Sequence, residues 1–163
     1  MLTSPAKISD TLALVGEALP RLHRAYYRLA LVVGKAGTGK TRLLQALHKK
    51  GGYPLLNVNL GVCERLLEHT IAERPRLAPR FLNEMVKEAQ SAIILLDNLE
   101  LLFDAPLALN PLQLLQSMSR NVTLVVAWSG EYTDGKLIYA EAGHPEYREY
   151  SLAAQDAVIF NLG

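Results

Sequence analysis

The sequence predicts a three-layer α/β fold in which helices cover both faces of a parallel sheet of about five strands. Aliphatic runs at 29–33, 93–96 and 122–127 alternate with segments of helical periodicity. Alternation of this kind is typical of parallel strands joined by crossover helices. The first run ends in the glycine-rich segment 34–41, GKAGTGKT, which predicts a tight turn between a strand and a helix.

Length and composition are those of a globular protein. The 163 residues fit one domain, with 1–27 as an N-terminal helix and lead-in and 28–163 as the core. Cys63 is the single cysteine, which excludes an intramolecular disulfide and argues against a thiolate zinc site. The apolar runs are too short to span a bilayer and the N-terminus lacks a signal-peptide pattern, so we expect a cytoplasmic protein with no membrane contact.

Charge is distributed unevenly along the chain. The net charge is +1, but residues 1–53 hold nine Lys/Arg against two acidic residues, which leaves −6 on the remainder. A basic half around the glycine-rich segment attracts a polyanionic ligand. DNA is also a polyanion, yet the sequence has no helix-turn-helix, zinc finger or aromatic-studded basic strand, so no motif supports a DNA contact.

The first elements follow from periodicity and from helix breakers. Residues 8–24 space apolar side chains at intervals of three and four, which predicts a helix that Pro20 kinks or ends. Tyr26 and Tyr27 then become candidates for stacking on a base, with packing against the sheet as the alternative. A second helix is predicted over 41–50, and PLLNVNL at 54–60 predicts the second strand.

Two helices are predicted next, over 62–73 and 79–90, with Pro75 as the break between them. The aliphatic run at 93–96 predicts the third strand. A helix over 107–120, entered through Pro106 or Pro111, leads to the fourth strand at 122–127.

A hairpin is expected over 131–143, turning at Thr133-Asp134-Gly135 with 136–140 as its second arm. Both 150–153 and 157–160 are candidates for the last strand, and periodicity does not decide between them. No C-terminal helical lid is expected.

Residues 34–41 match G-x-x-x-x-G-K-[ST], the phosphate-binding loop, at every fixed position. The glycines open backbone conformations in which successive N–H groups surround phosphate oxygens. Lys40 carries an ammonium to the outer phosphates, and Thr41 offers a hydroxyl to Mg²⁺ at the positive end of a helix. The sequence therefore predicts a P-loop NTPase core that binds ATP and Mg²⁺ through Gly34, Lys35, Ala36, Gly37, Thr38, Gly39, Lys40, Thr41 and Arg42.

Asp97 ends the buried run 93–96 and is predicted to reach Mg²⁺ beside Thr41, directly or through water, because ligands bind at the carboxyl ends of parallel strands. One strand, at 54–60, separates the phosphate-loop strand from the Asp97 strand. An inserted strand is the arrangement of the additional-strand ATPases, the branch that includes AAA-type machines. It predicts the sheet order 5-1-4-3-2.

Hydrolysis requires a group that orients and deprotonates water. Asn98 occupies the position where many such ATPases carry Glu, and it can position water without acting as a base. Glu100 is the candidate carboxylate, with an ordinary solvated side chain as the alternative. Asn57 and Asn59 are further polar candidates at the end of the second strand.

Ser129 ends the fourth strand, where it faces the γ-phosphate as a polar sensor or closes the turn with Gly130. With Lys40, Asp97, Asn98 and Glu100 it completes the predicted catalytic set. Arg148 and Arg120 are the candidates for an arginine finger, and an ordinary surface arginine is the alternative for each.

Four segments, GKAGTGKT, LLDNLE with the LLF that follows, AWSG and LIYAEAGHPEYREY, together resemble the BrxF family. These are the small P-loop proteins of type 3 BREX phage-exclusion systems in bacteria. The likeness covers about residues 25–150. It implies an ATP-binding component of a defence complex that separates phage DNA from host DNA with the help of a methyltransferase. It also implies partners among the other BREX proteins, including a large ATPase.

Three functions stay open. The first is a Mg²⁺-dependent ATPase with slow or partner-dependent turnover, working in a homo-oligomer or hetero-complex. The second is a nucleotide-gated assembly module that does not hydrolyse ATP. The third is a small-molecule kinase, in which the arginines at 74, 76 and 80 would form a lid that closes over phosphate. It lacks the acidic pair expected after the second strand, where Asn57-Val58-Asn59 stands.

Overall fold

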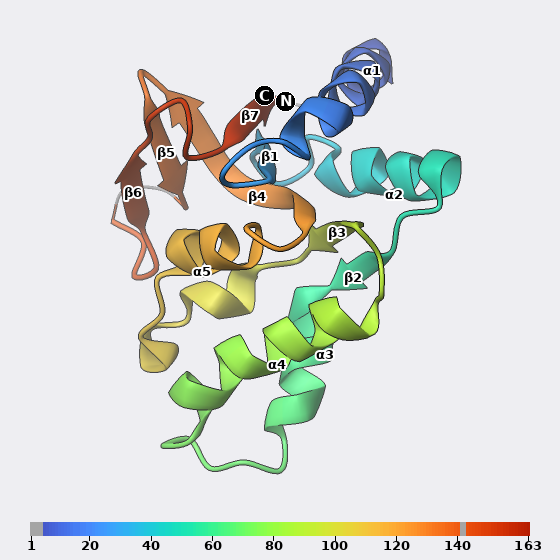
Figure 1. Cartoon of the computed structure of the whole chain (residues 1–163). Coiled ribbons are helices and arrows are strands. Elements are labelled where there is room, and N and C mark those ends of the chain that lie inside the picture. The colour runs from blue at the N-terminus through green and yellow to red at the C-terminus, as the bar shows by residue number, and fades with distance from the viewer. Residues whose placement is uncertain (1–4, 141–142) are drawn as a thin grey trace.

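The structure is a computed structural model that describes residues 5–140 and 143–163. A central sheet of parallel strands runs through the molecule (Figure 1). Its strands are β1 (Leu29–Gly34), β2 (Leu55–Asn57), β3 (Ile93–Asp97), β4 (Thr123–Thr133) and β7 (Val158–Asn161). Their spatial order is β2-β3-β4-β1-β7, and each neighbouring pair is parallel. Counted along the chain and read from β7, this is the predicted order 5-1-4-3-2, which is therefore confirmed.

Helices cover both faces of this sheet, as predicted. Side chains alternate along β1, so that Leu29, Leu31 and Val33 face one layer while Ala30 and Val32 face the other. The first layer contains α3 (Val58–Leu66), α4 (Arg74–Glu88) and α5 (Pro111–Met118). The second layer contains α1 (Pro5–Leu22) and α2 (Lys40–Gly51). Every residue of β1 is buried, because both of its faces are covered.

The segment after Pro54 differs from the prediction of a strand over 54–60 and a helix over 62–73. Strand β2 ends at Asn57 and α3 begins at Val58. The reason is a cap: the side chain of Asn57 accepts a hydrogen bond of 3.0 Å from the backbone N–H of Leu60. This bond satisfies one of the free amides at the start of a helix, so the chain turns helical earlier than its hydrophobic pattern indicates.

Helix α4 begins at Arg74, and Pro75 lies in its first turn instead of breaking the chain. A proline there loses nothing, because the first amides of a helix have no partner within it. The predicted start at residue 79 is wrong for this reason, and Pro79 lies inside the helix. The helix predicted over 107–120 is shorter: Asn110 caps α5 by accepting from the N–H of Gln113 at 3.2 Å.

Strand β4 continues past the predicted end at residue 127 and forms the hairpin directly with β5 (Lys136–Tyr139). Asp134 and Gly135 turn it with φ values of 52° and 75°, the left-handed pair of a two-residue hairpin. Both candidate last strands form. Arg148–Ser151 is β6, antiparallel to β5, whereas β7 joins β1 in the parallel sheet. Residues 141–142 of the predicted hairpin, and 1–4 of the predicted lead-in, lie outside the described residues.

The described residues that follow β4 form strands and turns and contain no helix, so this part of the chain shows no helical lid. Two short 3-10 helices, η1 (Glu100–Phe103) and η2 (Ala105–Leu107), connect β3 to α5. None of the described helices is both long and apolar enough to cross a bilayer.

Candidate functional site

The loop between β1 and α2 takes a conformation that only glycine permits at several points. Gly37 and Gly39 have φ values of 83° and 97°, in the left-handed region. At Gly34 the limit is space, because a Cβ would lie 2.3 Å from Oγ1 of Thr38. Thr38 in turn donates a 2.8 Å hydrogen bond to the carbonyl of Lys35 and closes the loop.

Lys40 is tied to this loop. Its Nζ donates to the carbonyl oxygens of Gly34 at 2.8 Å and Lys35 at 2.9 Å, and the residue is only 8% exposed. Burial lowers the pKa of Lys40, and the charges of Asp97 and Glu100 partly offset this by raising it. A cation is therefore held inside a ring of backbone groups at the N-terminus of α2, an arrangement suited to binding phosphate.

Thr41 and Asp97 meet across 56 positions of sequence. The Thr41 hydroxyl donates a 2.7 Å hydrogen bond to Oδ2 of Asp97, and Oδ1 of Asp97 accepts from the N–H of Asn98 at 2.9 Å. A hydroxyl beside a carboxylate is a donor set suited to Mg²⁺, which keeps several waters and takes phosphate oxygens as ligands. The residues present therefore fit this ion together with a nucleotide. Within the described residues, no cluster of three His, Cys, Asp or Glu side chains offers a separate metal site.

Sheet register brings further residues of β2, β3 and β4 to the same edge. Gly34 on β1 is paired with Ser129 on β4, and Asn57 on β2 is paired with Asp97 on β3. Ser129 lies inside β4, which continues to Thr133, so the prediction that it ends the strand and the alternative that it closes a turn with Gly130 are both wrong. Its pairing with Gly34 nevertheless places it one strand away from the first glycine of the loop. Beyond it, Glu131 forms an exposed ion pair of 2.7 Å with Lys35.

Glu100 lies near this edge, since its charge acts on Lys40. Asn98 has a φ of 58°, and η1 begins at Glu100. The side-chain amide of Asn59 donates to Oε2 of Glu100 at 2.8 Å, and its carbonyl oxygen accepts from the N–H of Leu101 at 2.7 Å. Asn59 thus connects the first turn of α3 to the segment that carries Glu100. The sequence predicted Asn59 as a polar candidate for the site, but no local signal indicated its hydrogen bond with Glu100.

Tyr26, Tyr27 and Arg120 are not brought to this edge. They precede β1 and β4, so they lie at the opposite end of strands whose six paired residues extend about 20 Å. The Arg120 guanidinium lies 4.1 Å from the centre of the Tyr26 ring, and Tyr27 packs against the core. The expectation that these tyrosines stack on a base bound at the loop of the same chain is therefore wrong.

Arg148 lies closer to the loop, on the antiparallel extension of the sheet. It is paired with Tyr139 of β5, which is paired in turn with Gly130 of β4. Its Nη1 donates to the carbonyl of Tyr147 at 3.3 Å. Arg42 is exposed on the first turn of α2, beside the loop.

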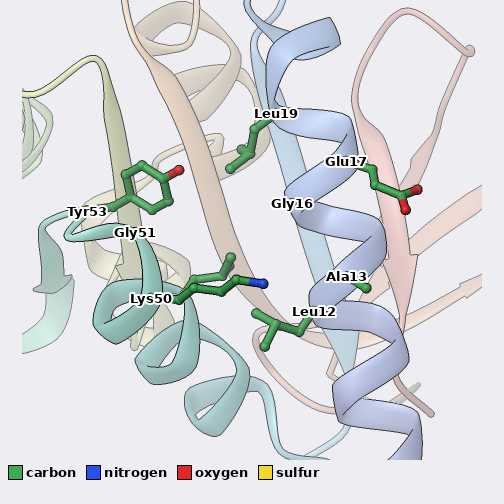
Figure 2. A pocket seen from close by; sticks show the side chains of 9 residues that line it. Leu12, Ala13, Gly16, Glu17, Leu19, Lys50, Gly51 and Tyr53 are labelled. Carbon is green, nitrogen blue, oxygen red and sulfur yellow. The ribbon is translucent and has the colours of Figure 1, made fainter.

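Two hollows border these elements. One of about 400 Å³ adjoins the loop and is lined by Lys35, Ser129, Gly130, Glu131, Ile138, Ala140 and Tyr147. Another of about 490 Å³ lies between α1 and α2, where Gly16 faces Lys50, Gly51 and Tyr53 (Figure 2). The second is at the C-terminal end of α2, away from the loop, and none of the predicted site residues lines it.

The model of the AAA family, the ATPase family associated with various cellular activities, matches residues 30–129, a span that holds the loop, Asp97 and Ser129. Among solved structures, C. elegans PCH-2 is similar with 17% identity and a TM-score of 0.44, over 100% of this chain and 44% of that one. A search of curated proteins found no match. The chain belongs to the AAA family of ATPases.

Proposed function

We propose that this chain binds ATP with Mg²⁺ at the loop 34–41 and hydrolyses it as part of a larger assembly. Membership of an ATPase family supports ATP binding and hydrolysis. The observation that carries the proposal is the 2.7 Å hydrogen bond from Thr41 to Asp97, because it joins the phosphate loop to a carboxylate at the position where Mg²⁺ is needed.

Each residue of the site has a proposed task. The backbone amides of the loop and the ammonium of Lys40 bind the phosphates, while Thr41 and Asp97 hold Mg²⁺. When bound, Mg²⁺ neutralises charge on the phosphate oxygens. Glu100 orients the attacking water and takes its proton, and Ser129 contacts the outer phosphate. The Asn59 side chain holds Glu100 until the site is complete, an assignment supported by their 2.8 Å hydrogen bond.

A second candidate function is a nucleotide-gated assembly module with negligible turnover. Two observations favour it. The residue directly after Asp97 is Asn98, whose amide cannot act as a base. The next carboxylate along the chain after Asp97, Glu100, already accepts a hydrogen bond from Asn59. In this case ATP changes the state of association without being consumed.

We place the protein in the cytoplasm as a component of a bacterial anti-phage complex of the BREX type. The support is the resemblance of GKAGTGKT, LLDNLE, AWSG and LIYAEAGHPEYREY to the BrxF family. Its proposed partners are other proteins of the defence system, in a homo-oligomer or hetero-complex. A neighbouring subunit then supplies the arginine finger, for which Arg148 is the first choice because Arg120 packs on Tyr26.

The test combines calorimetry with turnover. Wild type, Lys40→Ala and Glu100→Gln are titrated with ATP and Mg²⁺, and phosphate release is followed with and without the partner proteins. We expect Lys40→Ala to lose binding, and Glu100→Gln to bind ATP but lose turnover by about 100-fold or more. Binding with a nucleotide-dependent change in mass, and no phosphate release under any condition, supports the assembly module instead. Absence of binding by wild type contradicts both functions.

A further inference from the structure

Helix α3 is apolar on two sides, and only one of them is covered. Val58, Val62 and Leu66 are buried in the core. On the other side Leu60 is 58% exposed, and Leu67 and Ile71, at the end of the helix and in the loop to α4, are 74% and 73% exposed. Leu67 and Ile71 line one cavity, and exposed aliphatic side chains that cluster in this way mark a site of interaction. We call Leu60, Leu67 and Ile71 the α3 apolar patch.

The patch borders a cavity of about 250 Å³. Its walls come from three segments that are distant in sequence: α3, the start of α4, and the 3-10 turns after β3. Most of the lining is aliphatic, and the cavity can accept an apolar side chain from outside. It is lined by Cys63, Leu66, Leu67, Ile71, Arg74, Leu101, Asp104, Pro106 and Leu107.

The charges around the patch are mainly negative. Segments 58–76 and 99–107 contain five carboxylates and three arginines. Of these arginines, only Arg65 is paired with a carboxylate among the described residues, with Glu88 at 2.7 Å. Arg74 keeps its charge, because its Nε donates to the neutral carbonyl of His69 at 3.3 Å, so the five carboxylates face two arginines, Arg74 and Arg76, that are unpaired within residues 5–140 and 143–163. The carboxylates of Glu68 and Asp104 have no hydrogen bond or ion pair within the described part of the chain and remain available to a cation.

The cavity is also connected to the candidate site. Leu101 lines it, and the backbone N–H of Leu101 bonds to the same Asn59 side chain that holds Glu100. A side chain that enters the cavity therefore touches Leu101, one position away from the proposed base. None of the loop residues 34–41 lines the cavity, so the inference does not require that nucleotide binds.

From these observations we infer that the α3 apolar patch is the docking surface for an amphipathic helix of a partner protein. The helix carries a stripe of Leu-sized side chains, one of which enters the cavity, and Lys or Arg residues along its flank that face Glu68 and Asp104. Grooves of this kind bind helices through apolar anchors spaced three or four residues apart. The flanking charges select against acidic helices.

The experiment uses two fluorescein-labelled synthetic helices with identical leucine stripes, one with lysine and one with glutamate at the polar positions. Anisotropy is measured without nucleotide, so that failure here is distinguishable from failure to bind ATP. We expect the Leu/Lys helix to bind at least about tenfold more tightly than the Leu/Glu helix. The Leu67→Ser/Ile71→Ser double variant, altered only at exposed positions, is expected to weaken binding of the Leu/Lys helix by at least about tenfold.

Leu14→Ser is the matched control, since Leu14 is 54% exposed but lies on α1. It is expected to bind the Leu/Lys helix as wild type does. Cys63 lines the cavity and is the single cysteine, so the rate of its reaction with Ellman's reagent reports occupancy. We expect bound Leu/Lys helix to slow that reaction.

Four outcomes overturn the inference: no binding of the Leu/Lys helix, equal binding of both helices, no loss in the double variant, or an equal loss in Leu14→Ser. Light scattering adds a fifth. If wild type self-associates and the double variant is a monomer, a second copy of the chain covers the patch, and the partner helix is excluded.

Discussion

The hydroxyl of Thr41 and the carboxylate of Asp97 share a 2.7 Å hydrogen bond that joins the first turn of α2 to the last residue of β3. One residue comes from the phosphate loop and the other from a strand two positions away in the sheet, with β4 between them. The pair sets the metal position in the proposed mechanism, and it leads to the first prediction.

Asp97→Asn keeps an oxygen that can accept from Thr41 but removes the negative charge that Mg²⁺ requires. We expect ATP binding without Mg²⁺ to stay within about twofold of wild type, while the gain in affinity on adding Mg²⁺ is lost. Calorimetry with ATP, with and without Mg²⁺, measures both quantities. A normal Mg²⁺ response in Asp97→Asn contradicts the assigned role. Thr41→Ser, which keeps the hydroxyl, is the control.

Lys40→Ala is expected to weaken ATP binding by at least about tenfold, because it removes the cation held at 2.8 Å and 2.9 Å from two loop carbonyls. Fluorescence titration with a labelled ATP analogue provides the measurement. Lys49→Ala is the matched control, because Lys49 lies on the last turn of the same helix. An equal loss in both variants attributes the effect to general charge and not to the loop.

Substitutions at Asn98 test why glutamate is absent there. Its φ of 58° lies in the left-handed region, which asparagine tolerates better than glutamate. We expect Asn98→Glu to lower the free energy of unfolding by about 1 kcal/mol. Asn98→Gly should stay within about 0.5 kcal/mol of wild type. Urea denaturation at constant m-value checks both. Equal stability of the two variants shows that the backbone conformation is not the constraint.

The raised pKa of Tyr139 leads us to expect a loss of stability at high pH. Burial, reinforced by the nearby carboxylates of Glu100, Glu146 and Asp104, raises the pKa of its hydroxyl to about 12. In the unfolded chain the Tyr139 hydroxyl ionises at about pH 10, whereas in the folded protein it stays neutral until about pH 12. The contribution of the Tyr139 hydroxyl to the free energy of unfolding is therefore complete below pH 10 and is lost as the pH rises toward 12.

Urea midpoints of wild type and Tyr139→Phe across this range test the sign. Wild type is expected to lose more stability than the variant between about pH 10 and 12, because the variant has no hydroxyl to ionise. Parallel pH profiles for the two proteins contradict the assignment. A profile in which the variant loses more does so as well.

Gly130→Ala is expected to destabilise the fold by about 2 kcal/mol or more, since the added Cβ would lie 1.8 Å from the backbone oxygen of Ile138. That oxygen also accepts from Nε1 of Trp128, the single tryptophan, at 3.1 Å. Tryptophan emission therefore reports any displacement of the Ile138 carbonyl directly. At Gly16, where an added Cβ meets nothing within 4 Å, alanine serves as the control and is expected to leave emission unchanged.

Much of the parallel sheet and of the phosphate loop was predictable, because both depend on local signals. Runs rich in β-branched residues such as 29–33 and 122–127 predict buried strands, and glycines at 34, 37 and 39 predict a loop that approaches phosphate. Position along the chain then led to the strand order 5-1-4-3-2, which the structure confirms. The roles of the site residues stay predictions until the experiments above are done.

The predictions that were wrong concern residues whose local signal is compatible with two structures. Pro75 breaks a helix in its interior but begins one in its first turn, and Asn57 extends a strand or caps a helix. Tyr26 and Tyr27 precede the phosphate-loop strand in sequence, which suggested proximity to the nucleotide. The loop follows the C-terminal end of β1, whereas these tyrosines precede its N-terminal end, so they lie at the opposite edge of the sheet.

The sequence by itself determined the elements whose conformation depends on neighbouring residues: the phosphate loop, the buried strands and the aspartate that ends β3. Only the tertiary structure decided which polar groups meet, as in the contacts of Thr41 with Asp97 and of Asn59 with Glu100, and which apolar face of α3 stays uncovered. The physical reason is that such contacts join residues separated by 56 and 41 positions. Their geometry is set by the way the strands and helices pack together, and residues far apart in sequence meet only once that packing has formed.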